Sequence, residues 1–466
     1  MPTSEAQEPS LPPVQVVVRI RPSLDSEEVE VPLLRGEGGT VRLSAEENCE
    51  ENIADRDCRR VRKPQDFRFS SVFGPSTSQE EVYQGLNIDE LIAKVAEGYH
   101  ATVFAYGQTG SGKTYTMEGY RYRVHADGPQ VCIDETTPES LGVIPRALRK
   151  LFAHLEHLQE SDAETESSVS ISFLQIYQEK IYDLLNPAPL PQGVGPQEDA
   201  GLRLRWDSLR ECFFVENLFV YQCATADDAL RYYNAGVHRK QMATTSMNIA
   251  SSRSHTVLML SLQRRSHVPG DDQGVLKEVT SNLTLVDLAG SEKAAASEAA
   301  ERFKEAVNIN QSLFVLRRVI TALSRSGRDE HVPYRESKLT SLLQHAIGGK
   351  GFMVMLACLS PANKFYEENL STLQYASQAA LIQNEPVINL DPKDRLIEQL
   401  QQQLLAAHEY ILQHMGLEEL PEELRANSVR PVKVHKMSSG KASGFSLDRA
   451  DFAWQRWRGL RLVREG

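Results

Sequence analysis

The sequence predicts an α/β fold in which helices cover both faces of a central sheet. Apolar runs rich in β-branched and aromatic residues, such as VQVVVRI at 14–20 and ATVFAY at 101–106, have the character of strands in a covered sheet. The glycine-rich segment GQTGSGKT follows the second run directly. Strand and helix patterns alternate around that segment, and this order is typical of a sheet with helices on both sides.

The N-terminal half supplies the first elements. After the strand at 14–20, a polar stretch ends in the charged run DRDCRRVRKPQD, which we expect to form a surface loop. FRFSSVF at 67–73 is expected to be one strand, and residues 101–106 another. The segment KTYTMEG would open a helix, and residues 118–141 are polar and irregular, so a long and functional loop is predicted there.

The next part of the chain continues the alternation. RALRKLFAHLEHL at 146–158 has helical periodicity, and SVSISFLQIYQEKIYDLL at 168–185 starts with strand alternation and shifts to a helical pattern. A proline- and glycine-rich loop is predicted at 187–201. HTVLMLSLQRR and SNLTLVDLAG carry two more strands, and no internal repeat is visible.

The glycine-rich segment fits a phosphate-binding loop. Its glycines let the backbone turn tightly and direct N–H groups inward, and the positive end of the following helix favours an anion. The spacing of Gly107, Gly112, Lys113 and Thr114 matches the pattern with a lysine for the β/γ-phosphates and a hydroxyl for Mg²⁺. The alternative is a glycine-rich turn that matches by chance. The predicted loop comprises Gly107, Gln108, Thr109, Gly110, Ser111, Gly112, Lys113 and Thr114.

Composition limits the possible functions. The chain has 466 residues, 41% of them hydrophobic and 24% charged, which suits a large globular domain with appendages. Its net charge of −12 argues against nucleic acid as a partner. Six scattered cysteines without a CxxC pair suit the reducing cytoplasm and disfavour a zinc site. No apolar run approaches a membrane span, and residues 1–12 are expected to be a flexible leader rather than a signal peptide.

The chain changes character after residue 384. Residues 385–394 contain two prolines and are predicted to be a short extended linker. Residues 395–415 form a predicted helix with a 3-4 apolar spacing, which fits either a short coiled coil that forms a homodimer or a helix packed on its own domain. The basic tail at 416–466, with tryptophans among its arginines, fits either an acidic partner or a flexible solvated segment. The apolar positions of the helix are Ile397, Leu400, Leu404, Ala407 and Ile411.

Two further motifs sharpen the nucleotide prediction. Asp287 ends an apolar strand, where it can hold Mg²⁺ through water, and the amide of Gly290 can contact a γ-phosphate. NIASSRSH at 248–255 is dense in hydroxyl groups, although by itself it also fits a serine-rich turn. The nearest candidate for a guanine motif, NKFY at 363–366, lacks the required aspartate, which favours ATP over GTP.

These motifs together resemble a kinesin motor domain, from about residue 13 to residue 389. In kinesin order the chain carries RIRP, YGQTGSGKTYTMEG, GVIPRAL, IYQEKIYDLL, MNIASSRSH, LVDLAGSE, NINQSL, HVPYRESKLT and ENLSTLQYA. The resemblance implies a P-loop NTPase fold at 13–384, with a central mixed, mainly parallel sheet flanked by helices. It also implies a microtubule-stimulated ATPase with ATP and Mg²⁺ as cofactors, and a place on the cytoplasmic cytoskeleton.

The resemblance assigns roles to single residues around the nucleotide. Arg19 and Pro22 would flank the adenine, and Tyr115 would stack on it. Lys113 would neutralise the charge of the β/γ-phosphates, and Thr114 would ligate Mg²⁺.

Two switch regions complete the implied site. Ser251 and Ser252 would contact the γ-phosphate and Mg²⁺, with Asn248 nearby. Arg253 would pair with Glu292 of the second switch, closing the site over ATP and helping to order the attacking water; the alternative is a solvated ion pair of little energy. Asp287 and Gly290 would sense Mg²⁺ and the γ-phosphate, and His255 would orient its neighbours rather than act as a base.

The resemblance also implies a neck linker at 385–394, with Val387 and Ile388 packed into a groove and Asn389 as its latch. A motor followed by linker and helix resembles plus-end-directed kinesins; the alternative is an ordinary linker. Cargo or an adaptor is not identified by the sequence.

The surface expected to face tubulin departs from the family pattern. Neutral or small residues replace lysine or arginine at Gln311, Ser341, Gln374, Gln378 and Ala380. Arg317 and Arg318 stand where kinesins have small residues and would restore part of the positive charge, and Arg325, Arg335 and Lys338 remain. Three functions therefore stay open: a moving microtubule motor, a nucleotide-dependent binder that does not move, and an unrelated P-loop ATPase.

Overall fold

The computed structural model describes eleven stretches of the chain: residues 11–24, 34–44, 64–125, 128–132, 137–162, 164–188, 201–246, 251–267, 276–292, 300–325 and 331–415. The charged run at 55–66 lies mostly outside these residues, as do most of the predicted loop at 187–201, the leader at 1–10 and the tail at 416–466. Residues up to 389 belong to one compact unit, and residues 390–415 belong to a second unit.

A nine-stranded mixed sheet forms the centre of the first unit, in the order β10-β9-β14-β15-β6-β16-β1-β5, with β13 paired to β9. Strands β15, β6, β16, β1 and β5 are mutually parallel, and β9 shares their direction because it is antiparallel to β14, which is antiparallel to β15. The predicted mixed, mainly parallel sheet is therefore confirmed. Its strands are β1 Val14–Ile20, β5 Ser71–Phe73, β6 His100–Tyr106, β9 Glu166–Tyr177, β10 Lys180–Asp183, β13 Tyr221–Cys223, β14 His255–His267, β15 Leu276–Asp287 and β16 Gly351–Leu359.

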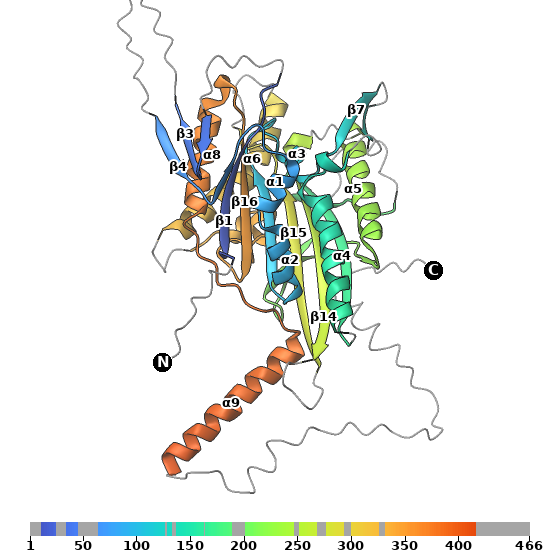
Figure 1. Ribbon diagram of the computed structural model, residues 1–466, viewed down its shortest axis with the longest axis vertical. Helices are drawn as coiled ribbons and strands as arrows, with labels where there is room; N and C mark the ends of the chain where they lie inside the picture. Colours follow the sequence, from blue (N-terminus) through green and yellow to red (C-terminus); the bar gives the residue numbers. More distant parts are fainter. Residues whose placement is uncertain are drawn as a thin grey trace, which may run out of the picture. The chain divides into compact units, whose positions relative to one another are not determined.

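Helices cover both faces of this sheet, as predicted (Figure 1). Alternation along β6 assigns the faces: Val103 and Ala105 pack with the α2–α4–α5 side, and Phe104 and Tyr106 pack with the α6–α7–α8 side. The helices are α1 Gln79–Gly85, α2 Ile88–Ala96, α3 Lys113–Met117, α4 Val143–Ser161, α5 Ala226–Ser246, α6 Ala300–Ser324, α7 Lys338–Leu342 and α8 Tyr366–Ala379, with short 3-10 turns η2 Pro138–Ser140, η3 Ser251–Arg253, η4 Tyr334–Glu336 and η5 Asn363–Phe365.

Three small antiparallel sheets accompany the central one. They are β2–β3–β4 (Leu34–Glu37, Thr40–Leu43, Gln65–Arg68), β7–β8 (Arg121–His125, Gly128–Cys132) and β11–β12 (Leu204–Asp207, Cys212–Val215). The second unit contains helix α9 Pro392–Met415, whose Ile397, Leu400 and Leu404 are exposed. No helix in the described residues is both long and apolar enough to cross a membrane.

Three local predictions are wrong. FRFSSVF forms two strands, because the chain leaves the small sheet after Arg68 and reaches the central sheet at Ser71, where it pairs with β1. The predicted loop at 118–141 contains the hairpin β7–β8. The predicted helix within 168–185 is the hairpin β9–β10, whose turn residues Gln178 and Glu179 adopt φ values of 48° and 59°.

Candidate nucleotide-binding site

The phosphate loop has the predicted strand–loop–helix setting, between β6 and α3. Gly107, Gly110 and Gly112 have φ values of 147°, 76° and 95°, in the range that favours glycine. A Cβ atom on Gly107 would lie 2.3 Å from the carbonyl oxygen of Cys358 on β16. The backbone of the neighbouring strand therefore leaves no room for a side chain at this position.

Lys113 is almost completely buried beneath this loop. Its Nζ donates hydrogen bonds of 2.8 Å to the carbonyl oxygens of Gly107 and Gln108, and burial lowers its pKa from the ordinary value. The amide group of Gln108 is buried and has no hydrogen-bond partner among the described residues. A buried ammonium and an unpartnered buried amide in one loop fit a site for an anionic polar ligand.

Thr114 and Asp287 meet where a magnesium ion is expected. The Thr114 hydroxyl donates to Asp287 Oδ2 at 2.6 Å, and Asp287 Oδ1 is buried and has no hydrogen-bond partner within the part of the chain that the structure describes. Mg²⁺ prefers hard oxygen ligands, so a hydroxyl beside a carboxylate with a spare oxygen fits this ion.

Lys240 on α5 completes the buried charges, and sequence reasoning missed it. Its Nζ lies 3.0 Å from Glu118 Oε1 and 3.8 Å from Asp287 Oδ2, and all three side chains are buried. Although burial opposes the charged form, the two carboxylates raise the pKa of Lys240 overall. Glu118, just after α3, thus helps to hold the lysine that faces the predicted metal ligand.

The predicted second switch lies against the predicted phosphate loop. Gly290 N donates to the carbonyl oxygen of Ser252 at 2.8 Å, which brings the two predicted switch regions together. The Glu292 carboxylate accepts hydrogen bonds from Thr109 N at 2.8 Å and Thr109 Oγ1 at 2.5 Å. The predicted pairing of Glu292 with Arg253 stays a prediction.

The first switch is described only in part. Ser251, Ser252 and Arg253 form η3, while Asn248 lies outside the described residues. The roles predicted for these residues at the γ-phosphate and Mg²⁺ stay predictions.

His255 is a buried, neutral positioning group. Its Nδ1 accepts a hydrogen bond from Ala289 N at 3.0 Å, so the proton resides on Nε2, which lies 2.7 Å from Ser312 Oγ. Burial, together with the charge of Lys113, lowers the pKa of His255 to about 3. This environment agrees with the expectation that His255 orients its neighbours, since it holds the segment before Gly290.

The residues predicted around the base differ in exposure. The Tyr115 side chain is 50% exposed, whereas Arg19 is buried and places its guanidinium 5.5 Å from the centre of the Tyr115 ring. Arg21, which sequence reasoning missed, donates to the carbonyl oxygen of Gly110 at 2.6 Å and so reaches the phosphate loop; Pro22 beside it is exposed. The RIRP pattern was the signal that could have identified Arg21.

Comparisons with known proteins agree with this arrangement. The family model of the kinesin motor domain matches residues 19–382. Human chromosome-associated kinesin KIF4A is 36% identical over 405 residues, and Drosophila melanogaster kinesin-like protein Klp61F is 40% identical over 355 residues. The matches cover 87% and 74% of this chain but only 29% and 31% of those proteins, so the chain spans about a third of their length.

Solved structures give the same result. A fast kinesin matches with a TM-score of 0.66 and 32% identity, covering 81% of this chain and 94% of that one. A KIF14 dimer, in a two-heads-bound state with AMP-PNP in complex with a microtubule, matches with a TM-score of 0.66 and 33% identity, covering 83% of this chain and 99% of that one.

Proposed function

This chain belongs to the kinesin motor family, whose motor domains are microtubule-stimulated ATPases, and from that premise we propose that it hydrolyses ATP and couples the nucleotide state to microtubule binding and to docking of a neck linker. The proposal includes movement toward the microtubule plus end, as a cytoplasmic protein on the cytoskeleton. The observation that carries it is the convergence of Lys113, Thr114 and Asp287 at one edge of the sheet.

The described residues divide the chemistry among them. Lys113 would exchange its two carbonyl partners for β/γ-phosphate oxygens, which places positive charge where negative charge develops in phosphoryl transfer. Thr114, Asp287 and Ser252 would hold Mg²⁺, which supplies further charge neutralisation. Lys240 places a positive charge 3.8 Å from Asp287 Oδ2, beside the carboxylate that would hold the ion.

The second switch would report on the terminal phosphate. The amide of Gly290 contacts Ser252 here, and a γ-phosphate would offer it a stronger acceptor. Glu292 would then leave Thr109 and pair with Arg253, with Ser251 facing the phosphate and Asn248 beside it. No covalent intermediate is needed, since positioning and electrostatics suffice for this reaction.

The neck linker, predicted at 385–394, is proposed at 385–391, between the motor domain at 13–384 and α9, because α9 begins at Pro392 and not at the predicted start of the helix, residue 395. Asn389 N and Asn389 Nδ2 both donate to the carbonyl oxygen of Gly98, at 2.9 and 3.1 Å, and Thr280 N donates to the carbonyl oxygen of Asn389 at 2.8 Å. Val387 N donates to the carbonyl oxygen of Lys350 at 3.2 Å. These contacts support a docked linker whose latch is Asn389. The helix is proposed to pair with a second copy.

A second function, a nucleotide-dependent microtubule binder that does not move, is favoured by the surface of α6. The exposed residues Gln311 and Phe314 on this helix are neutral, and Arg318 on the same helix pairs with Glu336. Arg317, expected to restore charge toward tubulin, instead donates to Ser371 on α8. Among residues 311–324, the part of this helix whose side chains are described, both arginines therefore contact other groups of the motor domain.

Steady-state ATPase measurements with and without microtubules test the proposal. We expect microtubules to stimulate turnover by about tenfold or more, which corresponds to a fall of about 1.4 kcal/mol in the barrier. Lys113→Ala should abolish turnover, whereas Lys94→Ala, at a partly exposed position on α2, should not. Turnover that microtubules leave unchanged would favour the second function, and turnover retained in Lys113→Ala would contradict the phosphate-loop assignment.

A further inference from the structure

Gln79, the first residue of α1, is a buried polar residue close to the predicted base-binding residues. Only 4% of it is exposed. Its Oε1 accepts a hydrogen bond from Arg19 Nη1 at 2.6 Å, and its Nε2 donates to the carbonyl oxygens of Tyr115 at 2.7 Å and Ser140 at 3.2 Å. One amide group therefore joins β1, α3 and the turn η2.

Two of the residues that Gln79 holds are those expected beside the base. The Arg19 guanidinium lies 5.5 Å from the centre of the half-exposed Tyr115 ring and also donates to Thr116 Oγ1 at 2.8 Å. An aromatic ring with one open side is a surface on which a purine can stack. The orientation of that ring depends on the backbone of Tyr115, whose carbonyl group Gln79 binds.

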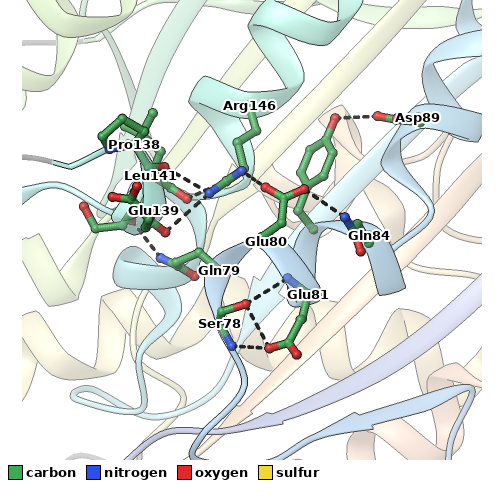
Figure 2. Close-up of polar contacts among 12 residues, drawn as sticks. Ser78, Gln79, Glu80, Glu81, Gln84, Asp89, Pro138, Glu139, Leu141 and Arg146 are labelled. Atoms are coloured by element: carbon green, nitrogen blue, oxygen red, sulfur yellow. Dashed lines mark hydrogen bonds and ion pairs between the residues drawn. The ribbon is translucent and has the colours of Figure 1, made fainter.

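The surroundings leave Gln79 little freedom. Figure 2 shows Gln79 directed toward the turn at residues 138–141, which the Arg146 side chain also reaches. Arg146 donates to the carbonyl oxygens of Leu141 at 2.9 Å and Pro138 at 3.0 Å, and it pairs with Glu80 on α1. Arg146 therefore holds both the helix that carries Gln79 and the turn that Gln79 contacts, through hydrogen bonds and an ion pair that do not involve Gln79.

We propose that Gln79 is a positioning residue for the nucleotide base: it holds Arg19 and the Tyr115 backbone in fixed relation, so that ATP is bound through its base as well as its phosphates. The proposal rests on ATP binding as proposed above. An amide both donates and accepts, so neither an alkyl group nor a carboxylate of similar size can make all three hydrogen bonds. Loss of this amide should weaken binding of the base and leave binding of the phosphates unchanged.

Calorimetric titration of MgATP and of magnesium tripolyphosphate, which has no base, tests this role in wild type, Gln79→Met and Gln84→Met. Gln84 is the matched control, since it lies exposed on the same helix and bonds to Glu80 at 3.0 Å. For Gln79→Met we expect the Kd of MgATP to rise about tenfold while that of tripolyphosphate stays within about twofold. The KM for ATP should rise in parallel with kcat unchanged.

Other outcomes overturn the proposal. If wild type binds ATP, an unchanged Kd of MgATP in Gln79→Met excludes the positioning role. An equal rise in the Kd values of MgATP and tripolyphosphate excludes it as well. Wild-type protein that does not bind ATP at all overturns the proposed function and this inference together. If Gln79→Met does not fold, Gln79→Glu provides the same comparison, because it keeps an acceptor for Arg19 and loses the donor to the two carbonyl groups. A loss confined to ATP supports the proposal, and an unchanged Kd overturns it.

Discussion

The ammonium group of Lys240 and the carboxylate of Glu118 lie 3.0 Å apart, and their side chains are only 4% and 1% exposed. A second carboxylate, that of Asp287, lies 3.8 Å from the same ammonium group. One buried ammonium group therefore neutralises two buried carboxylates. Its removal would leave two negative charges close together in the protein interior without a counter-charge.

Lys240→Met should lower the free energy of unfolding by about 3 kcal/mol or more, because it breaks a buried ion pair and leaves its partners uncompensated. Urea unfolding monitored by circular dichroism measures this loss. Lys94→Met is the matched control: its ion pair with Glu97 is partly exposed, so the loss should be below about 1 kcal/mol. Equal losses in the two variants would contradict the importance of burial.

His255 should make the protein less stable as the pH falls below the ordinary histidine pKa. Burial and Lys113 lower its pKa from 6.5 to about 3, so the folded state keeps it neutral while the unfolded state takes up a proton. Its contribution to stability is complete above pH 6.5 and decreases by about 1.4 kcal/mol for each pH unit below that value, until it is lost near pH 3.

The test is chemical denaturation at several pH values between 7.5 and 5, chosen to span the start of that decrease. His255→Gln retains a donor and an acceptor but does not titrate, so its unfolding free energy should depend less on pH than that of wild type. An identical pH dependence in His255→Gln and wild type would refute the assignment.

Arg317 should stabilise the packing of α6 on α8. Its Nη2 donates to Ser371 Oγ at 2.7 Å, and its guanidinium lies 5.7 Å from the centre of the Tyr375 ring. Arg317→Met is expected to lower the free energy of unfolding by about 1–2 kcal/mol. The neighbouring Arg318→Met removes only an exposed ion pair and should cost less than about 1 kcal/mol, as measured by denaturation. The reverse order would contradict this packing role.

Asn389→Ala should weaken the docking proposed above for the neck linker. The change removes the side-chain hydrogen bonds from Asn389 Nδ2 to the carbonyl oxygens of Gly98 and Val387, both 3.1 Å long. Protection of the Asn389 and Thr280 backbone amides against hydrogen exchange should fall about tenfold. Asn186→Ala, which alters a distant loop, should leave this protection unchanged. Protection that survives in Asn389→Ala would show that backbone contacts alone hold the linker.

The sequence predicted those parts of the fold whose signals are local. The run at 101–106 followed by GQTGSGKT placed β6, the loop and α3 correctly, because apolar strand residues and glycines at strained positions act through their nearest neighbours. The helical pattern at 146–158 likewise lies within α4.

The β9–β10 hairpin shows where local reasoning failed. IYQEKIYDLL has helical spacing, but Gln178 and Glu179 adopt left-handed backbone conformations that few residues other than glycine favour. Tertiary contacts hold this turn, since the Glu179 carboxylate accepts from Ser337 Oγ at 2.9 Å and from Lys338 N at 2.8 Å. A contact across more than 150 residues has no signal in a local window.

In the candidate site, too, local sequence signals were visible and tertiary contacts were not. The residues of the predicted phosphate loop are contiguous in the sequence, whereas Lys240 on α5, Glu118 just after α3 and Gln79 on α1 lie far from one another along it. A lysine or glutamine in a polar helical stretch usually faces solvent. Only the three-dimensional arrangement shows that these side chains are buried against the site.

Strand β6 connects the phosphate loop with the segment that contacts Asn389. The carbonyl group of Gly98, which binds Asn389, lies just before this strand, and the phosphate loop follows it. A strand of 7 residues spans about 23 Å and cannot lengthen or shorten appreciably. Nucleotide exchange therefore cannot act on Asn389, the proposed latch, by lengthening or shortening β6. Coupling between the nucleotide site and Asn389 would instead require rigid-body tilting of the sheet or movement of the helices packed on its faces.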